Sequence, residues 1–131
     1  MQEKDLFEYA VIRVVPRVER EEFMNVGVIL YCSKQRFLKC VFDIDEERLL
    51  AFSNNINITE LKARLNAFCF VCEGSTQGGP IGKAPIASRF RWLTATRSTV
   101  VQTSAVHPGL CFNAGETLVK MLKQLVGSND V

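Results

Sequence analysis

The amino-acid sequence predicts an α+β fold, with a mainly antiparallel sheet and helices packed on one face of it. Three observations lead to this prediction. Residues 9–31 hold two β-rich apolar runs around a charged turn, and a third such run follows to complete a three-stranded meander. Further along the chain, apolar residues recur every three or four positions, as on a helix that packs against a sheet, and a later fourth strand lies among them.

The first two runs, 9–15 and 23–32, are predicted to form a long antiparallel hairpin centred near Glu19. Side chains alternate between the two faces of a strand, so each run has one uniformly apolar face and one mixed face. A slip of one residue would place an apolar face beside a mixed one, and the pattern therefore selects one register. The expected cross-strand pairs are Val14 with Met24, Arg13 with Asn25, and Ile12 with Val26.

The third run, 36–43, is expected to follow a short turn at Ser33 and Lys34. This turn places Val41 opposite Gly27 and Asp43 opposite Asn25. Arg13, Asn25 and Asp43 then form a polar line across the mixed faces of three strands. Such a line is either an ordinary exposed salt link or a polar site beside Gly27, where the absent side chain leaves room for a ligand.

Two helices are expected after the meander. Asp43 or Asp45 caps a short helix over residues 46–52, since both are good N-cap residues before an acidic first turn. Asn57 begins a longer helix with a capping-box-like pattern, and Gly74 ends it.

The second half of the chain alternates between loops and short elements. Residues 74–85 are rich in Gly and Pro and are expected to lack regular structure. A short helix over 86–93 and a strand over 100–104 follow, and His107 to Leu110, HPGL, is expected to be a turn. A closing helix starts at Asn113 with a second capping-box-like pattern and ends at Gly127.

The densest polar stretch lies between Arg89 and Gly109. Guanidinium groups and hydroxyls that converge there would suit a carboxylate or a phosphate, because arginine offers a fixed fork of donors. The alternative is a set of ordinary solvated side chains on a helix and an exposed strand face. With the polar line of the meander, the candidate ligand-binding residues are Arg13, Asn25, Asp43, Arg89, Arg97, Ser98, Gln102, Ser104 and His107.

His107 is the only histidine of the chain. As a general base it would need Ser98 or Ser104 within hydrogen-bond reach and an orienting carboxylate such as Asp43. The spacing does not establish such an arrangement. The sequence therefore assigns no catalytic residue and leaves enzyme activity open.

The cysteines do not predict a metal site. Cys69 and Cys72 form a CxxC motif that His107 and Cys111 would complete as a zinc set. The motif, however, lies in an apolar helical stripe, whereas metal-binding CxxC pairs usually lie on turns. The odd total of five cysteines, mostly on apolar faces, indicates reduced core thiols. No cofactor and no metal are predicted.

Length and composition set limits on the class of protein. A chain of 131 residues is expected to fold as a single domain, residues 1–131. The composition, with 47% hydrophobic and 23% charged residues, excludes a disordered chain. The net charge of +2 gives no general attraction to nucleic acid or anionic membranes. No apolar run approaches the roughly 18 residues of a membrane span. The start, MQEKDLFEY, lacks a signal-peptide core, so we expect a cytoplasmic protein.

Two long blocks of the sequence, YAVIRVVPRVEREEFMNVGVILYC and SRFRWLTATRSTVVQTSAVHPGL, resemble a bacterial family catalogued as domain of unknown function 3037 (DUF3037). The likeness covers nearly the whole chain. It implies a small bacterial protein without an established activity, and members of this family are often encoded beside a HipA-like kinase. It supplies no catalytic assignment. The matching positions are Arg13, Arg17, Glu19, Arg20, Asn25, Gly27, Arg89, Trp92, Arg97, Ser98, Gln102, Ser104, His107 and Gly109.

Three functions follow as hypotheses. The first is an accessory module that binds a protein partner, for which the resemblance suggests a HipA-like kinase. The second is a small enzyme, or a binder of a phosphate or carboxylate ligand, that uses the Arg, Ser and His residues. The third, less favoured, is binding of single-stranded nucleic acid by arginines interleaved with Trp92 and Phe90. An exposed apolar patch or an unpaired sheet edge would favour the first, and an enclosed pocket joining Arg13, Asn25 and Asp43 to Arg97 and His107 would favour the second. The sequence leaves open the oligomeric state and the strand that pairs with the fourth strand.

Overall fold

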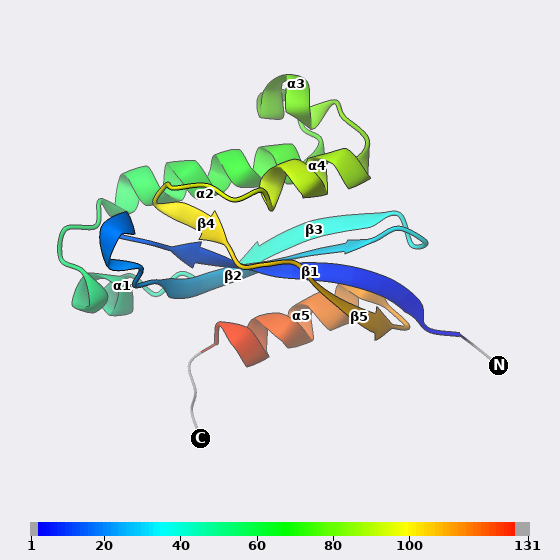
Figure 1. Cartoon of the computed structure of the whole chain (residues 1–131), viewed down its shortest axis with the longest axis horizontal. Coiled ribbons are helices and arrows are strands. Elements are labelled where there is room, and N and C mark those ends of the chain that lie inside the picture. Colours follow the sequence, from blue (N-terminus) through cyan, green and yellow to red (C-terminus); the bar gives the residue numbers. More distant parts are fainter. Residues whose placement is uncertain (1–2, 128–131) are drawn as a thin grey trace.

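The structure, a computed structural model, describes residues 3–127 and confirms the α+β class. Within these residues one open antiparallel sheet has the strand order β3-β2-β1-β4, and β5 also pairs with β1 (Figure 1). The strands are β1 (Asp5–Val14), β2 (Met24–Cys32), β3 (Phe37–Phe42), β4 (Val101–Thr103) and β5 (His107–Cys111). The main helices are α1 (Glu46–Phe52), α2 (Ile58–Glu73), α4 (Ile86–Leu93) and α5 (Ala114–Leu125).

Helices lie on both faces of the sheet. Figure 1 shows α2 and α4 on one side and α5 on the other. Two buried apolar clusters separate accordingly, one under α2 and α4 and one under α5. The sequence predicted helices on one face of the sheet. The structure has α2 and α4 on one face and α5 on the other.

A β-bulge in β2 explains why both faces are apolar. The pairs of Val14 with Met24 and of Arg13 with Asn25 are confirmed. Ile12, however, lies opposite Gly27, because Val26 is an extra residue in β2 at this point. Beyond the bulge, each side chain of β2 faces the side opposite to the one predicted. As a result, Ile29 and Tyr31 lie in the apolar cluster under α2 and α4. Val28, Leu30 and Cys32 lie in the cluster under α5.

The register of β3 also differs from the prediction by one residue. The β2–β3 turn spans four residues, 33–36, and ends with Arg36 in a left-handed conformation at φ 50°. As a result Gly27 lies opposite Phe42, where Val41 was expected. Asp43 lies past the end of β3, and its backbone N–H donates to the carbonyl of Val26 at 2.8 Å. The predicted pair of Asp43 with Asn25 is wrong for this reason.

Gly27 does not leave an opening in the sheet. A Cβ at this position would lie 2.5 Å from the Cδ1 of Phe42 and 2.5 Å from the carbonyl oxygen of Val41. The Phe42 ring occupies the space that a side chain would need. Glycine is therefore required here for close packing between neighbouring strands.

The segment HPGL was expected to be a turn, and this prediction is wrong, since it forms β5. β4 pairs with residues 12–14 of β1 and β5 pairs with residues 5–9, so the two strands share one edge of β1. Pro108 is tolerated because an edge strand need not donate every N–H. At Gly109 a Cβ would lie 2.4 Å from the Phe7 ring, so the glycine admits that ring to the core.

The helix boundaries follow the capping signals closely. Asp45, Asn57 and Asn113 each accept a hydrogen bond from the backbone N–H three residues later, at 3.1, 3.0 and 2.9 Å. Gly74 ends α2 in a left-handed conformation at φ 71°. The segment expected to be irregular contains two single turns, η2 (Thr76–Gly78) and α3 (Gly79–Gly82).

Gln35, in the β2–β3 turn, connects three elements that are distant in the sequence. Its Nε2 donates to the Asp5 carboxylate and to the Phe112 carbonyl, each at 3.0 Å. Its Oε1 accepts from the N–H of Ala114 at 2.9 Å, which satisfies a free donor in the first turn of α5. One side chain thus fixes the start of β1, the end of β5 and the start of α5.

Replacing Gln35 by alanine is expected to lower the free energy of unfolding by about 1–3 kcal/mol, because the part-buried partners lose their hydrogen bonds together. Urea denaturation measures this change. Lys34→Ala, at the exposed neighbouring position of the same turn, is the matched control and should stay within about 0.5 kcal/mol of wild type. Equal effects of the two substitutions would contradict the connecting role of Gln35.

Candidate functional site

Three of the candidate residues are cross-strand neighbours and form a polar row across the sheet, in which Asn25 bonds to α5. Arg13, in the central strand β1, lies opposite Asn25 of β2 on one side and opposite Gln102 of β4 on the other. Asp43 is exposed and does not belong to this row. The structure therefore replaces the predicted line of Arg13, Asn25 and Asp43 with a line of Asn25, Arg13 and Gln102.

The row makes contacts that hold structural elements together. The Arg13 guanidinium lies 3.9 Å from the centre of the Phe23 ring, a cation–π contact. The Nδ2 of Asn25 donates to the Leu125 carbonyl at 3.2 Å and so ties the end of α5 to the sheet. The Nε of Arg13 and the Oδ1 of Asn25 are buried and make no hydrogen bond in the described part of the chain. Gln102 turns back to donate to the Thr99 carbonyl at 2.8 Å.

Arg97 caps the C-terminal end of α4. Its guanidinium donates to the carbonyls of Trp92 and Leu93, the latter at 3.0 Å, and lies 4.4 Å from the centre of the Trp92 ring. Cations are favoured at this end of a helix, where backbone carbonyls lack partners. Its donors are therefore largely committed to the helix end.

Arg89, within α4, binds the segment that precedes this helix. Its Nη1 donates to the Ala84 carbonyl at 2.6 Å, and its guanidinium lies against Gly74. The side chain thereby connects α4 to both ends of the 74–85 segment.

Ser104 completes the hydrogen bonding of β1 between β4 and β5. It is the one buried polar residue in the described part of the chain, at 7% exposure. Its Oγ accepts from the N–H of Val11 at 2.8 Å, and its own N–H donates to the Val11 carbonyl at 2.8 Å. The hydroxyl thus takes the place of a strand carbonyl at the point where the edge strand is interrupted.

His107, Ser98 and Asp43 are exposed and belong to separate parts of the fold. The His107 ring packs against Tyr9, its cross-strand neighbour, at a centroid distance of 5.6 Å. Among residues 3–127, no hydrogen bond joins His107 to Ser98, Ser104 or Asp43. The structure does not bring these residues into a nucleophile–base arrangement.

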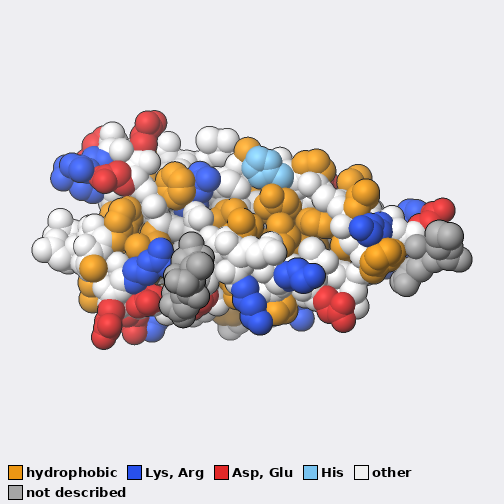
Figure 2. Space-filling view, turned by 90° about the horizontal axis from the view of Figure 1, so that it is seen from below, with side chains coloured by type: hydrophobic (Ala, Val, Ile, Leu, Met, Phe, Trp, Pro, Cys, Tyr) orange, Lys and Arg blue, Asp and Glu red, His pale blue; other side chains and the backbone are white. Residues whose placement is uncertain are grey.

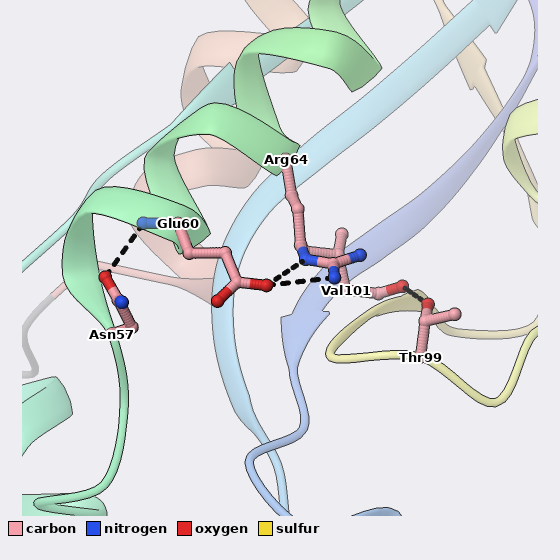
Figure 3. A network of polar contacts seen from close by, with 5 residues as sticks. All are labelled: Asn57, Glu60, Arg64, Thr99 and Val101. Atoms are coloured by element: carbon pink, nitrogen blue, oxygen red, sulfur yellow. Dashed lines mark hydrogen bonds and ion pairs between the residues drawn. The ribbon is translucent and has the colours of Figure 1, made fainter.

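A groove of about 340 Å³ between α2, α4 and β4 contains Arg97 and Gln102 and adds residues that the sequence did not indicate. Arg64 of α2 lines it, held by Glu60 at 3.0 Å (Figure 3). Figure 3 shows Arg64 reaching from α2 toward the segment of Thr99 and Val101. The remaining wall is apolar and includes Phe68 and Trp92. We call this the α2–β4 groove.

The CxxC motif and the β5 residues do not form a metal site. Cys72 belongs to the cluster under α2, whereas Cys111 belongs to the cluster under α5, on the opposite face of the sheet. No group of three or more His, Cys, Asp or Glu side chains within residues 3–127 is placed to hold a metal ion.

Several other arginines are paired within the chain and do not form a basic surface. Arg17 pairs with Glu19 at 2.9 Å, Arg20 with Glu22, and Arg91 with Glu8 through two bonds of 2.7 and 2.8 Å. The bonds to Glu8 raise the pKa of Arg91. Figure 2 shows Lys and Arg side chains interspersed with acidic and hydrophobic ones on the α5 side. Among the described residues on that face, no continuous positive strip is seen that would suit nucleic acid.

These features define a small α+β protein whose candidate polar residues mostly make contacts within the fold. Asn25 ties α5 to the sheet, Arg97 binds the end of α4, and Ser104 completes the hydrogen bonding of β1. The chain belongs to a family described as "Protein of unknown function (DUF3037)", whose match covers residues 9–126. The resemblance inferred from the two sequence blocks is thereby confirmed. No curated protein and no solved structure matches the chain. Within residues 3–127, no helix combines the length and apolar character that crossing a membrane requires.

Replacing Ser104 by alanine is expected to lower the free energy of unfolding by about 1–3 kcal/mol, because the buried N–H of Val11 loses its acceptor. Thermal or urea denaturation measures the change. Ser98→Ala, at an exposed position of the same segment, is the control and should have little effect. If Ser104→Ala were neutral, the proposed role of the hydroxyl in the β1 hydrogen-bond ladder would be wrong.

Proposed function

We propose that this protein is a single-domain, cytoplasmic accessory module that binds a protein partner through the apolar end of β1 and β5. The observation that carries the proposal is a pair of exposed leucines. Leu6 and Leu110 lie directly opposite each other on neighbouring strands and are 61% and 63% exposed. Two large apolar side chains paired in this way mark a surface that favours contact with another molecule.

The pair extends the sheet face that α2 and α4 cover. Leu6 alternates with Ala10 and Ile12 of the same strand, which lie in the α2–α4 cluster. Figure 1 shows α2 and α4 over the middle of the sheet, while β1 and β5 continue toward the N-terminal end. A hollow of about 410 Å³ beside Leu6 and Leu110 is lined by Tyr31 as well.

Charged side chains surround this apolar centre. Lys4 and Lys34 line the same hollow, and Glu8 lies there with its bond to Arg91. Phe112, the residue that follows β5, is 51% exposed and lies under the Lys4 ammonium at 5.3 Å. An apolar centre with a charged rim is the usual composition of a protein–protein interface. We name Leu6, Leu110 and Phe112 the β1–β5 apolar surface.

The family resemblance suggests which partner to test first. Because its members are often encoded beside a HipA-like kinase, such a kinase is the partner that we propose. The rim of the surface carries charges of both signs, so complementary charges on the partner would fix its orientation.

The contacts of the candidate polar residues support this function over catalysis. An enclosed pocket that joins Arg13 and Asn25 to Arg97 and His107 would favour a ligand-processing site, whereas these residues lie in separate environments. Arg97 in particular binds backbone carbonyls of α4. Binding of nucleic acid lacks support for the same reason, since most of the arginines that it would use have partners within the chain.

The test is co-purification of tagged protein with the purified HipA-like kinase and, separately, from a lysate of its native cell. Leu110→Glu is expected to weaken binding by about tenfold or more, because it places a charge at the apolar centre of the interface. Val119→Glu is the control, since Val119 is comparably exposed at 53% on α5, across the sheet. A stoichiometric partner that binds wild type and the Val119 variant, but not the Leu110 variant, supports the proposal. Undiminished binding by Leu110→Glu would reject this surface, and the absence of any partner would reject the function.

A small anionic ligand in the α2–β4 groove is a second candidate function. Arg64 and Arg97 line this groove beside the Trp92 ring. A ligand there would meet both positive charges, while the Arg97 donors also stay bonded to the carbonyls of Trp92 and Leu93. We expect inorganic phosphate to raise the melting temperature of wild type, and Arg64→Ala to abolish that rise. Lys62→Ala, on an exposed position of the same helix, is the control for general charge effects. An equal rise in both variants would indicate nonspecific stabilisation by salt.

A further inference from the structure

Three thiols meet where β3 packs against α2. Cys40 comes from β3, and Cys69 and Cys72 come from one side of α2, since residues three apart in a helix are neighbours. The Sγ atoms of Cys40 and Cys69 lie 3.3 Å apart. The CxxC motif is therefore joined by a third cysteine that is 29 positions away from Cys69 in the sequence.

The three thiols differ in exposure and in electrostatic environment. Cys72 is 1% exposed, while Cys40 and Cys69 are partly exposed. The hydrogen bond from the Cys40 thiol lowers the pKa of Cys69, against the opposing effects of burial and of the Glu73 charge. The same contact raises the pKa of Cys40 and keeps it protonated. Cys69 is thus the accessible thiol that most readily forms a nucleophilic thiolate.

We infer that Cys40 and Cys69 form an oxidation site at which hydrogen peroxide converts two thiols into a disulfide between β3 and α2. The contact distance, the partial exposure of Cys69 and the arrival of the two sulfur atoms from different elements carry this inference. It is independent of the proposed partner and of the β1–β5 apolar surface.

The reaction proceeds in two balanced steps. The Cys69 thiolate attacks one oxygen of hydrogen peroxide, the O–O bond breaks, and the released hydroxide takes up a proton to give water. Sulfur is oxidised to the sulfenic acid while the peroxide is reduced by two electrons. The Cys40 sulfur then attacks the Cys69 sulfur, so that an S–S bond forms and the S–O bond breaks. The Cys40 proton leaves with the hydroxyl group as a second water.

A disulfide at this point would join the two layers of the fold. It closes a loop over residues 40–69, which contains α1 and most of α2. Such a crosslink restricts the unfolded chain, so oxidation is expected to raise the melting temperature. Reduction by a dithiol would reverse the change.

The remaining two cysteines provide an internal comparison. Cys32 and Cys111 are both buried, at 0% and 4% exposure, in the cluster under α5. Burial and the neighbouring Cys32 raise the pKa of Cys111, so this thiol stays protonated. These two residues are expected to be unreactive under conditions that oxidise Cys69.

The experiment treats the reduced full-length protein with hydrogen peroxide and measures its intact mass, its disulfide map and its melting temperature. We expect a loss of two hydrogen atoms, a crosslinked peptide pair containing Cys40 and Cys69, and a rise in melting temperature on the order of 5–10 °C. Mapping of the wild-type protein does not depend on whether any variant folds.

Three variants assign the two roles. Cys40→Ser, which keeps a hydrogen-bond donor beside Cys69 but cannot form the disulfide, should accumulate a sulfenic acid at Cys69 that dimedone captures. Cys69→Ala should lose both the crosslink and the dimedone adduct. Cys111→Ala is the control and should form the same crosslink as wild type. An unchanged wild-type mass, a crosslink between any other pair, or dimedone capture at a cysteine other than Cys69 would overturn the inference.

Discussion

The extra residue at Val26 determines how the layers of this fold are assembled. Side chains of a strand point alternately to the two faces of the sheet. One inserted residue therefore moves every later side chain of β2 to the opposite face. On one side of the bulge Asn25 faces α5 beside Arg13, and on the other side Val28 and Leu30 also face α5. The same reversal sends Ile29 and Tyr31 to α2 and α4. Both faces of the hairpin thereby become apolar enough to bury a helix.

The central strand β1 explains why so many polar residues have structural roles. It is paired along both edges, and its second edge is shared by two short strands with a gap between them. Ser104 supplies the missing acceptor in that gap, and Gln35 fixes the far end of the same edge. A buried N–H donor without an acceptor lowers the free energy of unfolding by about 1–3 kcal/mol, which is more than a typical hydrogen bond contributes. These positions therefore require side chains that can supply the acceptor.

Most of the arginines discussed above make contacts within the chain. Arg97 binds the carbonyl end of α4, Arg89 fixes the segment before that helix, and Arg13 of β1 stacks on the Phe23 ring just before β2. A dense polar stretch in a sequence can therefore reflect side chains that fix helix ends and the segments beside them. The exposed cross-strand pair of Leu6 and Leu110 is instead apolar, and it lies at the uncovered end of β1 and β5.

The sequence by itself determined the features that depend on neighbouring residues. The caps at Asp45, Asn57 and Asn113 placed the helices, and the two apolar runs placed the hairpin and its first pairs, because capping and alternation act within a few residues. Tertiary structure alone decided the reversal at Val26, the pairing of β5 through Pro108 and Gly109, and the approach of Cys40 to Cys69. Each of these features arises from packing between segments that are far apart in the chain. Side-chain volume and hydrogen-bond partners on both segments select one arrangement there, and the propensity of neighbouring residues cannot select it.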